Sequence, residues 1–356
     1  MELFALLGFA GAALMVFSGF DLFGGNDDDE APETEEPIET EGPTTFLLDG
    51  STDEVTGTDG DDDFILLEGA GSMILDLDAG AGDDFVDLDV ATEPTATAPW
   101  ASTFDLGDGD DTLVGAALGN LVNGGAGDDV VILDYMEDMT VTGGDGDDLL
   151  SGSGINAGVS ELDGGAGNDT LIGTDTALNG GAGDDVLVTG GANDAFGNFY
   201  TTTDGGAGAD TISYLQDNIT FASDGYSPMK LNGGADGDTF ALDLIPGGDT
   251  YEGWDFIRMV DGVETFEAVR LGDFTPGEDV IEINADPLEG SPYTFTAARI
   301  ETEVTDDMPH STLVLRYEGD GLDPREMTVD LGDVVATWSD IAFVGAQVPV
   351  LSPAVA

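Results

Sequence analysis

The sequence predicts an all-β fold in which tight glycine turns alternate with short strands, and three observations carry this prediction. Residues 57–241 hold nine copies of a six-residue pattern rich in glycine and aspartate. A large apolar residue follows every copy at the same distance. The chain of 356 residues has a net charge of −69, yet 41% of its residues are hydrophobic, so it can bury a core.

The N-terminal part of the chain, residues 1–23, is apolar. Residues 3–20 carry no charge, and a helix of that length would span about 27 Å, close to the thickness of a bilayer core. We therefore expect membrane anchoring through residues 3–20, a signal peptide without the usual basic start, or an apolar helix of a soluble protein. Residues 24–45 contain acidic residues and three prolines, which predicts an extended linker.

The repeat region is assigned to residues 46–241. Five of its nine copies read G-G-x-G-x-D, and they begin at Gly124, Gly143, Gly164, Gly180 and Gly205. Four flanking copies depart from this pattern in their glycines, and their aspartates are Asp62, Asp84, Asp111 and Asp238. Repetition on this scale indicates a solenoid of stacked units.

The second residue after each motif aspartate is large and apolar in all nine copies. These residues are Phe64, Val86, Leu113, Val131, Leu150, Leu171, Leu187, Ile212 and Phe240. Alternate residues of a strand point to opposite faces. Each copy is therefore predicted to be a glycine turn followed by a short strand with one apolar residue directed inward.

The repeats resemble the hemolysin-type, or RTX, calcium-binding nonapeptide G-G-x-G-x-D-x-U-x. The resemblance covers about half of the chain, residues 57–241. It implies a right-handed parallel β-roll, in which six residues form a turn that binds Ca²⁺ and the next three form a strand. It also implies several Ca²⁺ ions as cofactors. Calcium prefers six to eight oxygen ligands, which carboxylates and turn carbonyls can supply.

The resemblance also implies which residues form the calcium sites. From the perfect copies these are Gly124, Gly125, Gly127, Asp129, Gly143, Gly144, Gly146, Asp148, Gly164, Gly165, Gly167, Asp169, Gly180, Gly181, Gly183, Asp185, Gly205, Gly206, Gly208 and Asp210. From the degenerate copies they are Asp62, Asp84, Asp111 and Asp238. The fifth motif position holds Asp128, Asp147, Asn168, Asp184 and Ala209. Because this position varies in charge, it is expected to contribute backbone atoms and no obligatory side-chain ligand.

The spacing of the copies departs from a strict nonapeptide array. The perfect copies begin 16 to 25 residues apart, which is about one 18-residue coil and not one nonapeptide. We therefore expect the well-formed turns to stack along one edge of the roll. Irregular stretches such as Ser151–Asn156 and Gly173–Asp175 are expected to form the opposite edge.

Residues 242–356 have an ordinary composition and are predicted to be a β-rich cap over the last coil. Val280–Ile283, Thr312–Tyr317 and Met327–Leu331 are the expected strands. The segment Asp273–Asp279 resembles a D-F-x-x-G-x-D stretch that often follows such repeats. His310, next to a proline, is interpreted as a surface loop residue. The apolar tail, Trp338–Ala356, is compatible with the C-terminal export signal that the resemblance implies.

Composition limits the functions open to this chain. Residues 1–229 contain no lysine or arginine, so the chain is expected to bind cations and not nucleic acid. It has no cysteine and one histidine, which excludes thiolate chemistry and zinc sites with several histidines. No catalytic motif is recognised, so we do not expect an enzyme.

The functional expectation is an extracellular or cell-surface calcium-binding protein with a structural or adhesive role. We expect that calcium binding drives the folding of this protein. The alternatives are a secreted hydrolase with an unrecognised C-terminal catalytic domain, and a cation-buffering surface protein without a defined roll. Neither the residues nor the resemblance names a protein or glycan partner.

Overall fold

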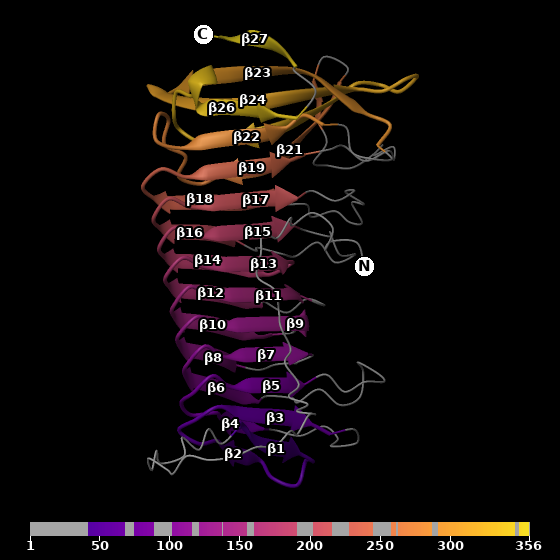
Figure 1. The fold of residues 1–356 in the computed structure, drawn as a ribbon. Helices are drawn as coiled ribbons and strands as arrows, with labels where there is room; N and C mark the ends of the chain where they lie inside the picture. The colour runs from indigo at the N-terminus through magenta and orange to yellow at the C-terminus, as the bar shows by residue number, and fades with distance from the viewer. Residues whose placement is uncertain are drawn as a thin grey trace, which may run out of the picture. The chain divides into compact units, whose positions relative to one another are not determined.

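The computed structural model describes residues 42–67, 75–88, 102–115, 121–136, 138–154, 160–190, 202–215, 228–244, 258–260, 263–286, 291–345 and 349–355, within a unit that spans Gly42–Ala356. Most of these residues form β-strands (Figure 1), and the one helix among them is the short 3-10 helix η2 (Trp338–Asp340), which confirms the all-β prediction. No helix in these ranges could cross a membrane. The predicted anchor or signal, residues 1–23, and most of the predicted linker lie outside the described residues.

The strands form two long sheets whose central parts are parallel. In order across the sheet, sheet A consists of β1 (Thr44–Leu48), β3 (Asp62–Leu66), β5 (Phe85–Leu88), β7 (Thr112–Gly115), β9 (Val130–Met136), β11 (Leu149–Gly154), β13 (Thr170–Thr174), β15 (Val186–Gly190), β17 (Thr211–Leu215), β19 (Thr239–Asp243), β22 (Val280–Asn284) and β26 (Ile341–Val344).

Sheet B begins with β2 (Glu54–Thr56), β4 (Asp76–Asp78), β6 (Thr103–Asp108), β8 (Leu121–Ala126), β10 (Thr140–Asp145), β12 (Glu161–Ala166), β14 (Ala177–Ala182), β16 (Thr202–Ala207) and β18 (Met229–Ala235). It continues with β21 (Val263–Leu271), β25 (Arg325–Asp330), β24 (Met308–Glu318), β23 (Thr294–Thr305) and β27 (Val350–Val355), and β20 (Arg258–Val260) pairs with β21.

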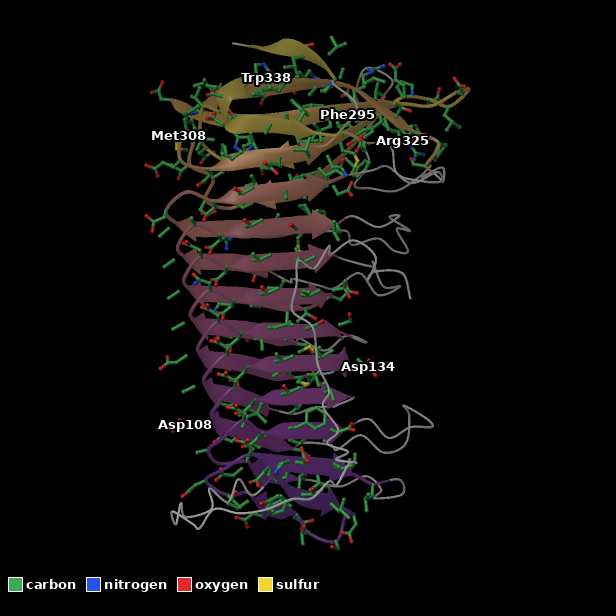
Figure 2. All side chains as sticks on the ribbon, viewed as in Figure 1. Asp108, Asp134, Phe295, Met308, Arg325 and Trp338 are labelled. Carbon is green, nitrogen blue, oxygen red and sulfur yellow. The ribbon has the colours of Figure 1, made fainter. Side chains whose placement is uncertain are left out.

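Each coil of the roll runs from a strand of sheet B through a glycine-aspartate turn into a strand of sheet A. The register is strict: Gly125, Gly144 and Gly165 pair in series across β8, β10 and β12. The turns therefore stack along one edge, as predicted from the spacing. Figure 2 shows Asp108 at this turn edge and Asp134 at the opposite edge.

The opposite edge differs in part from the prediction. Ser151–Gly154 belong to β11, and Gly173 and Thr174 belong to β13. These residues extend regular strands, because they pair with the strands of the neighbouring coils. Only Asp175 and Thr176 separate β13 from β14, while the end of the Ser151–Asn156 stretch lies outside the described residues.

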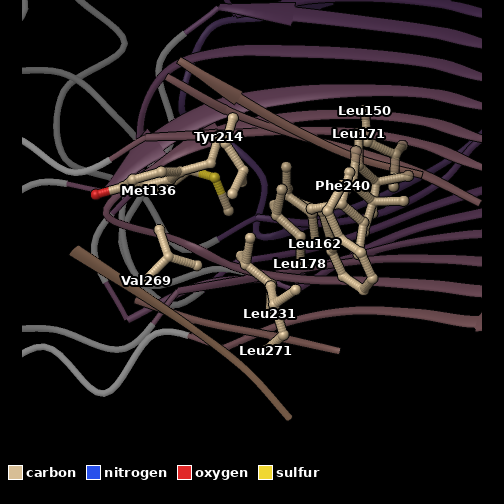
Figure 3. Packing of buried hydrophobic residues seen from close by; sticks show 14 of the residues in the cluster. Met136, Leu150, Leu162, Leu171, Leu178, Tyr214, Leu231, Phe240, Val269 and Leu271 are labelled. Carbon is tan, nitrogen blue, oxygen red and sulfur yellow. The ribbon is translucent and has the colours of Figure 1, made fainter. Parts of the chain in front are cut away.

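The core lies between the two sheets. All nine apolar residues predicted to point inward are completely buried, with relative exposures of 0%. A second buried row, from sheet B, faces them and was not predicted; it includes Phe104, Val122, Val141, Leu162, Leu178 and Leu231. Figure 3 shows members of both rows in the same hydrophobic cluster, with Leu150, Leu171 and Phe240 from sheet A and Leu162 and Leu178 from sheet B. This second row stands two residues before the first position of the motif, apolar in every copy except that of Gly205, which has Thr203, so the sequence did contain its signal.

The roll changes into antiparallel pairing at its C-terminal end. Strands β23, β24 and β25 pair antiparallel and continue sheet B, while β22 and β26 continue sheet A in parallel. The three strands predicted in this region are confirmed as parts of β22, β24 and β25, except that β25 ends at Asp330, one residue before the predicted end. His310, however, lies inside β24 and not in a loop, and its ring nitrogens lie 3.1 Å from carboxylate oxygens of Asp330 and Asp333. The preceding proline misled that interpretation, because Pro309 lies near the start of the strand.

Candidate metal centre

The three glycines of each turn are required by the stacking of the coils. The glycines at the second and fourth motif positions have positive φ, for example 120° at Gly125 and 131° at Gly127. A Cβ at Gly125 or Gly127 would overlap the carbonyl oxygen of the equivalent glycine in the preceding coil. A Cβ at the first glycine, Gly124, would overlap both the carboxylate of Asp129 and the carbonyl oxygen of Gly143 in the next coil.

The motif aspartates form a continuous hydrogen-bonded array, here called the inner ladder. Its members are Asp62, Asp84, Asp111, Asp129, Asp148, Asp169, Asp185, Asp210, Asp238 and Asp279. From Asp84 onward, the Oδ1 atom of each member accepts a hydrogen bond from the backbone N–H of the ladder aspartate in the preceding coil, at 2.7–3.0 Å. The turns thus place all nine predicted aspartates in one buried row.

The second carboxylate oxygen behaves differently. Among the described residues, no group donates a hydrogen bond to the buried Oδ2 of Asp84, Asp111, Asp129, Asp148, Asp169, Asp185 or Asp210. In the five perfect copies this oxygen faces the bare Cα of the first glycine, beside the carbonyl oxygen that the next coil presents. Buried polar atoms are almost always paired in proteins, so this row of seven oxygens calls for a partner.

The burial of the row also disfavours its negative charge. Burial raises the pKa of Asp111, Asp129 and Asp185 to about 7. It raises the pKa of Asp84, Asp148 and Asp238 to about 6, and it raises those of Asp169 and Asp210 as well. Neighbouring carboxylates add to the upward shift, whereas the backbone hydrogen bonds oppose it. A cation would reverse this penalty.

The fifth motif position forms a second array of hydrogen bonds, here called the outer ladder, with the opposite direction. Its members are Asp61, Asp83, Asp110, Asp128, Asp147, Asn168 and Asp184. Each side-chain oxygen accepts a hydrogen bond from the fifth-position N–H of the following coil, at 2.7–3.1 Å. The side chains of this exposed position therefore join the coils, a role that the sequence prediction missed. At Ala209 the array ends.

The donor set of the turns suits a hard cation. Each turn offers carboxylate and backbone carbonyl oxygens, with no nitrogen or sulfur ligand, and calcium binds such oxygens. In the part of the chain that the structure describes, no three acidic or histidine side chains converge on one point. A cation here would therefore rely on few carboxylates and on backbone carbonyls or water for its remaining ligands. The orphaned Oδ2 atoms of the five perfect copies, each beside a carbonyl oxygen that the next coil presents, fit this arrangement.

One ladder member, Asp279, was not among the predicted site residues. Its Oδ1 accepts the N–H of Asp238 at 3.0 Å, across 41 residues of sequence. The signal was present, because Asp279 ends the D-F-x-x-G-x-D segment, and Ile281 follows it by two residues as in the repeats. No protein-family model matches this sequence, and no curated protein does either.

Proposed function

We propose that this chain binds calcium as a hemolysin-type repeat protein, and that its stacked glycine-aspartate turns hold several Ca²⁺ ions. The observation that carries the proposal is the row of seven buried Oδ2 atoms without a hydrogen-bond partner in the described chain. An unpaired buried carboxylate costs several kcal/mol of folding free energy. Bound Ca²⁺ would supply the missing positive charge and accept these oxygens as ligands.

The residues proposed to hold the ions are the glycines and aspartates of the five perfect copies. Asp129, Asp148, Asp169, Asp185 and Asp210 supply carboxylate oxygen, while the glycines hold the turns open and present carbonyls. Asp84 and Asp111 have the same orphaned oxygen, but Ala79 and Leu106 occupy the first-glycine position of their turns.

Calcium would couple folding to location. Extracellular calcium modules commonly have dissociation constants of about 10⁻⁴–10⁻³ M, so the repeats would remain unfolded at cytoplasmic calcium and would fold outside the cell. Metal-binding free energy then becomes folding free energy. The proposed protein is therefore a secreted or surface-displayed structural or adhesive module, and not an enzyme.

The test is a calcium titration of the full-length protein, followed by far-ultraviolet circular dichroism. We expect a cooperative rise in β-sheet signal. Asp148→Ala combined with Asp169→Ala should move its midpoint to several-fold higher calcium. The matched control replaces the neighbouring outer-ladder residues, Asp147→Ala with Asn168→Ala, and should move the midpoint less. A complete β spectrum in chelator, together with no bound calcium, would contradict the proposal.

A further inference from the structure

The two ends of the inner ladder differ from its interior in the use of the second carboxylate oxygen. At the first turn, Asp62 Oδ2 accepts a hydrogen bond from the backbone N–H of Thr58 at 2.6 Å. At the last turn, Asp279 Oδ2 accepts one from the backbone N–H of Thr275, also at 2.6 Å. In the seven interior aspartates named above, the same atom has no such donor among the described residues.

The same residue type closes both ends. Thr58 and Thr275 each precede their ladder aspartate by four residues, where the perfect copies have their second glycine. In the interior, a side chain at that glycine would overlap the carbonyl oxygen of the preceding coil. In the described chain from residue 42 onward, the Thr58 turn is the first of the stack, so a side chain meets no such obstacle there. The Thr58 hydroxyl lies 3.1 Å from Asp62 Oδ1.

The C-terminal end is closed by a second carboxylate as well. Both oxygens of Asp273 accept hydrogen bonds at 2.9 Å, from the backbone N–H groups of Gly233 and Gly234. The Asp273 carboxylate therefore binds the backbone N–H groups of the glycine pair in the Gly233–Asp238 turn. Phe274, the next residue, is buried and packs edge-on against Phe240, with ring centroids 6.5 Å apart.

A backbone N–H aimed at Oδ2 has two effects on cation binding. It satisfies the oxygen, so the folded chain gains less from a metal ion there. It also directs the positive end of an amide dipole to the place where an ion would approach. Both effects apply to Asp62 and Asp279, and neither applies to the interior row.

We propose that Thr58 with Asp62, and Thr275 with Asp279, are terminators that close the ladder with hydrogen bonds, so that only the aspartates between them hold cations. This inference rests on the calcium-binding function proposed above. It removes Asp62 from the ligands that the sequence resemblance implied. Since the ladder has ten aspartates and two are terminators, at most eight inner-ladder positions remain for ions.

The test counts ions in the full-length protein. The parent, Asp62→Asn, Asp279→Asn and the matched interior variant Asp148→Asn are dialysed against calcium in about 0.3 M salt, which screens loose surface binding. Bound calcium per chain is then measured by atomic emission. The two end variants should retain the parent's count, and Asp148→Asn should lose at least one ion.

A second measurement does not depend on full occupancy. The dependence of folding stability on the logarithm of calcium concentration reports the number of ions taken up on folding. This slope should be unchanged in both end variants and lower in Asp148→Asn. The end variants should still unfold at lower denaturant than the parent, because the asparagine amide would face the N–H of Thr58 or Thr275.

The outcomes separate this inference from the function on which it rests. Loss of an ion in Asp62→Asn or Asp279→Asn, or a parent count of nine or ten, would overturn the terminators while leaving calcium binding intact. Absence of bound calcium in all four proteins would overturn the proposed function itself. If Asp62→Asn does not fold in excess calcium, the parent count and Asp279→Asn decide the question.

Discussion

In the coils between Asp62 and Asp238, buried carboxylates follow one another along the turn edge, and their partners are backbone N–H groups on one oxygen only. In the antiparallel strands β23–β25, buried Glu326 instead faces Arg299, whose two terminal nitrogens bind its two oxygens at 2.7 and 2.8 Å. Arg325, labelled in Figure 2, pairs with Glu264 at 3.1 Å. The two regions thus bury acidic groups in different ways.

The difference follows the distribution of basic residues. The chain places all five of its arginines after residue 257 and none in the repeats. The strands beyond β19, called the cap here, can therefore neutralise their acids with their own side chains. They also join the two sheets through aromatic packing, with Phe295 lying 5.8 Å from Phe343 of β26 between ring centroids. Within residues 46–241 the one basic residue is Lys230. Under the calcium-binding proposal, the repeats therefore depend on an external cation, whereas the cap carries its own counter-charges.

The largest expected effect is the removal of calcium. Chelation should unfold the repeats and leave much of the cap's ion pairing unaffected. A site at ten times its dissociation constant contributes about 1.4 kcal/mol, so five sites contribute about 7 kcal/mol. Hydrogen exchange in chelator and in calcium measures this directly. Protection lost in β8–β17 but kept in β23–β25 is the expected result. Equal loss in both regions would contradict a difference in calcium dependence between them.

A charge placed inside the roll should be the next most damaging change. Leu171 is fully buried, so Leu171→Asp should cost more than about 3 kcal/mol, even in saturating calcium. Its neighbour Ile172 belongs to the same strand but lies on the outward face. Ile172→Asp is therefore the matched control and should cost much less. Chemical denaturation compares the two variants, and equal losses would mean that the inward face is wrongly assigned.

Acidity should affect the two regions with opposite signs. Six ladder aspartates have folded-state pKa values raised to about 6–7, so the calcium-free roll binds more protons when folded than when unfolded; they are Asp84, Asp111, Asp129, Asp148, Asp185 and Asp238. Its stability should therefore be highest near pH 4 and should fall as the pH rises through 7. The slope is about 1.4 kcal/mol per pH unit for each extra proton bound.

In the cap the sign is reversed. Burial alone would raise the pKa of Glu326, but the hydrogen bonds and charge of Arg299 hold that pKa below its ordinary value. Its contribution is present above pH 4.5 and is lost as the pH falls below it.

The pH dependence of the roll can be measured by circular dichroism in chelator, which should show more β signal at pH 5 than at pH 8. A weaker signal at pH 5 would argue against the ladder as the source of the dependence.

The smallest expected effect lies in the cap. Glu326→Gln removes the charge that faces Arg299 and should cost about 1–3 kcal/mol, equally at low and high calcium. Glu318→Gln is the control, since Glu318 is exposed and its pairing with Arg316 is worth less than about 1 kcal/mol. Thermal unfolding at two calcium concentrations checks both variants. A calcium-dependent cost for Glu326→Gln would show that cap and roll are not independent.

The repeating unit could be predicted from the residue pattern. Glycines at fixed places predicted the turns, and an apolar residue two places after each aspartate predicted the inward row, because turn conformation and strand alternation are local properties of the chain. These signals were sufficient for Leu171 and the other eight core positions, and for stacking along one edge. The opposite edge was in part wrongly predicted as irregular, because Ser151–Gly154 carry no comparable local pattern although they belong to β11.

The hydrogen bonding of the carboxylates could not be predicted in the same way. The Oδ1 atom of a ladder aspartate receives its hydrogen bond from the coil beside it, 16 to 41 residues away in the sequence. Asp62 and Asp148 occupy the same motif position, yet one accepts a local N–H on Oδ2 and the other does not. The opposite directions of the two ladders, and the place of Asp279 at the end of one, follow from the pairing register of the coils. Such register is a property of packing and not of composition.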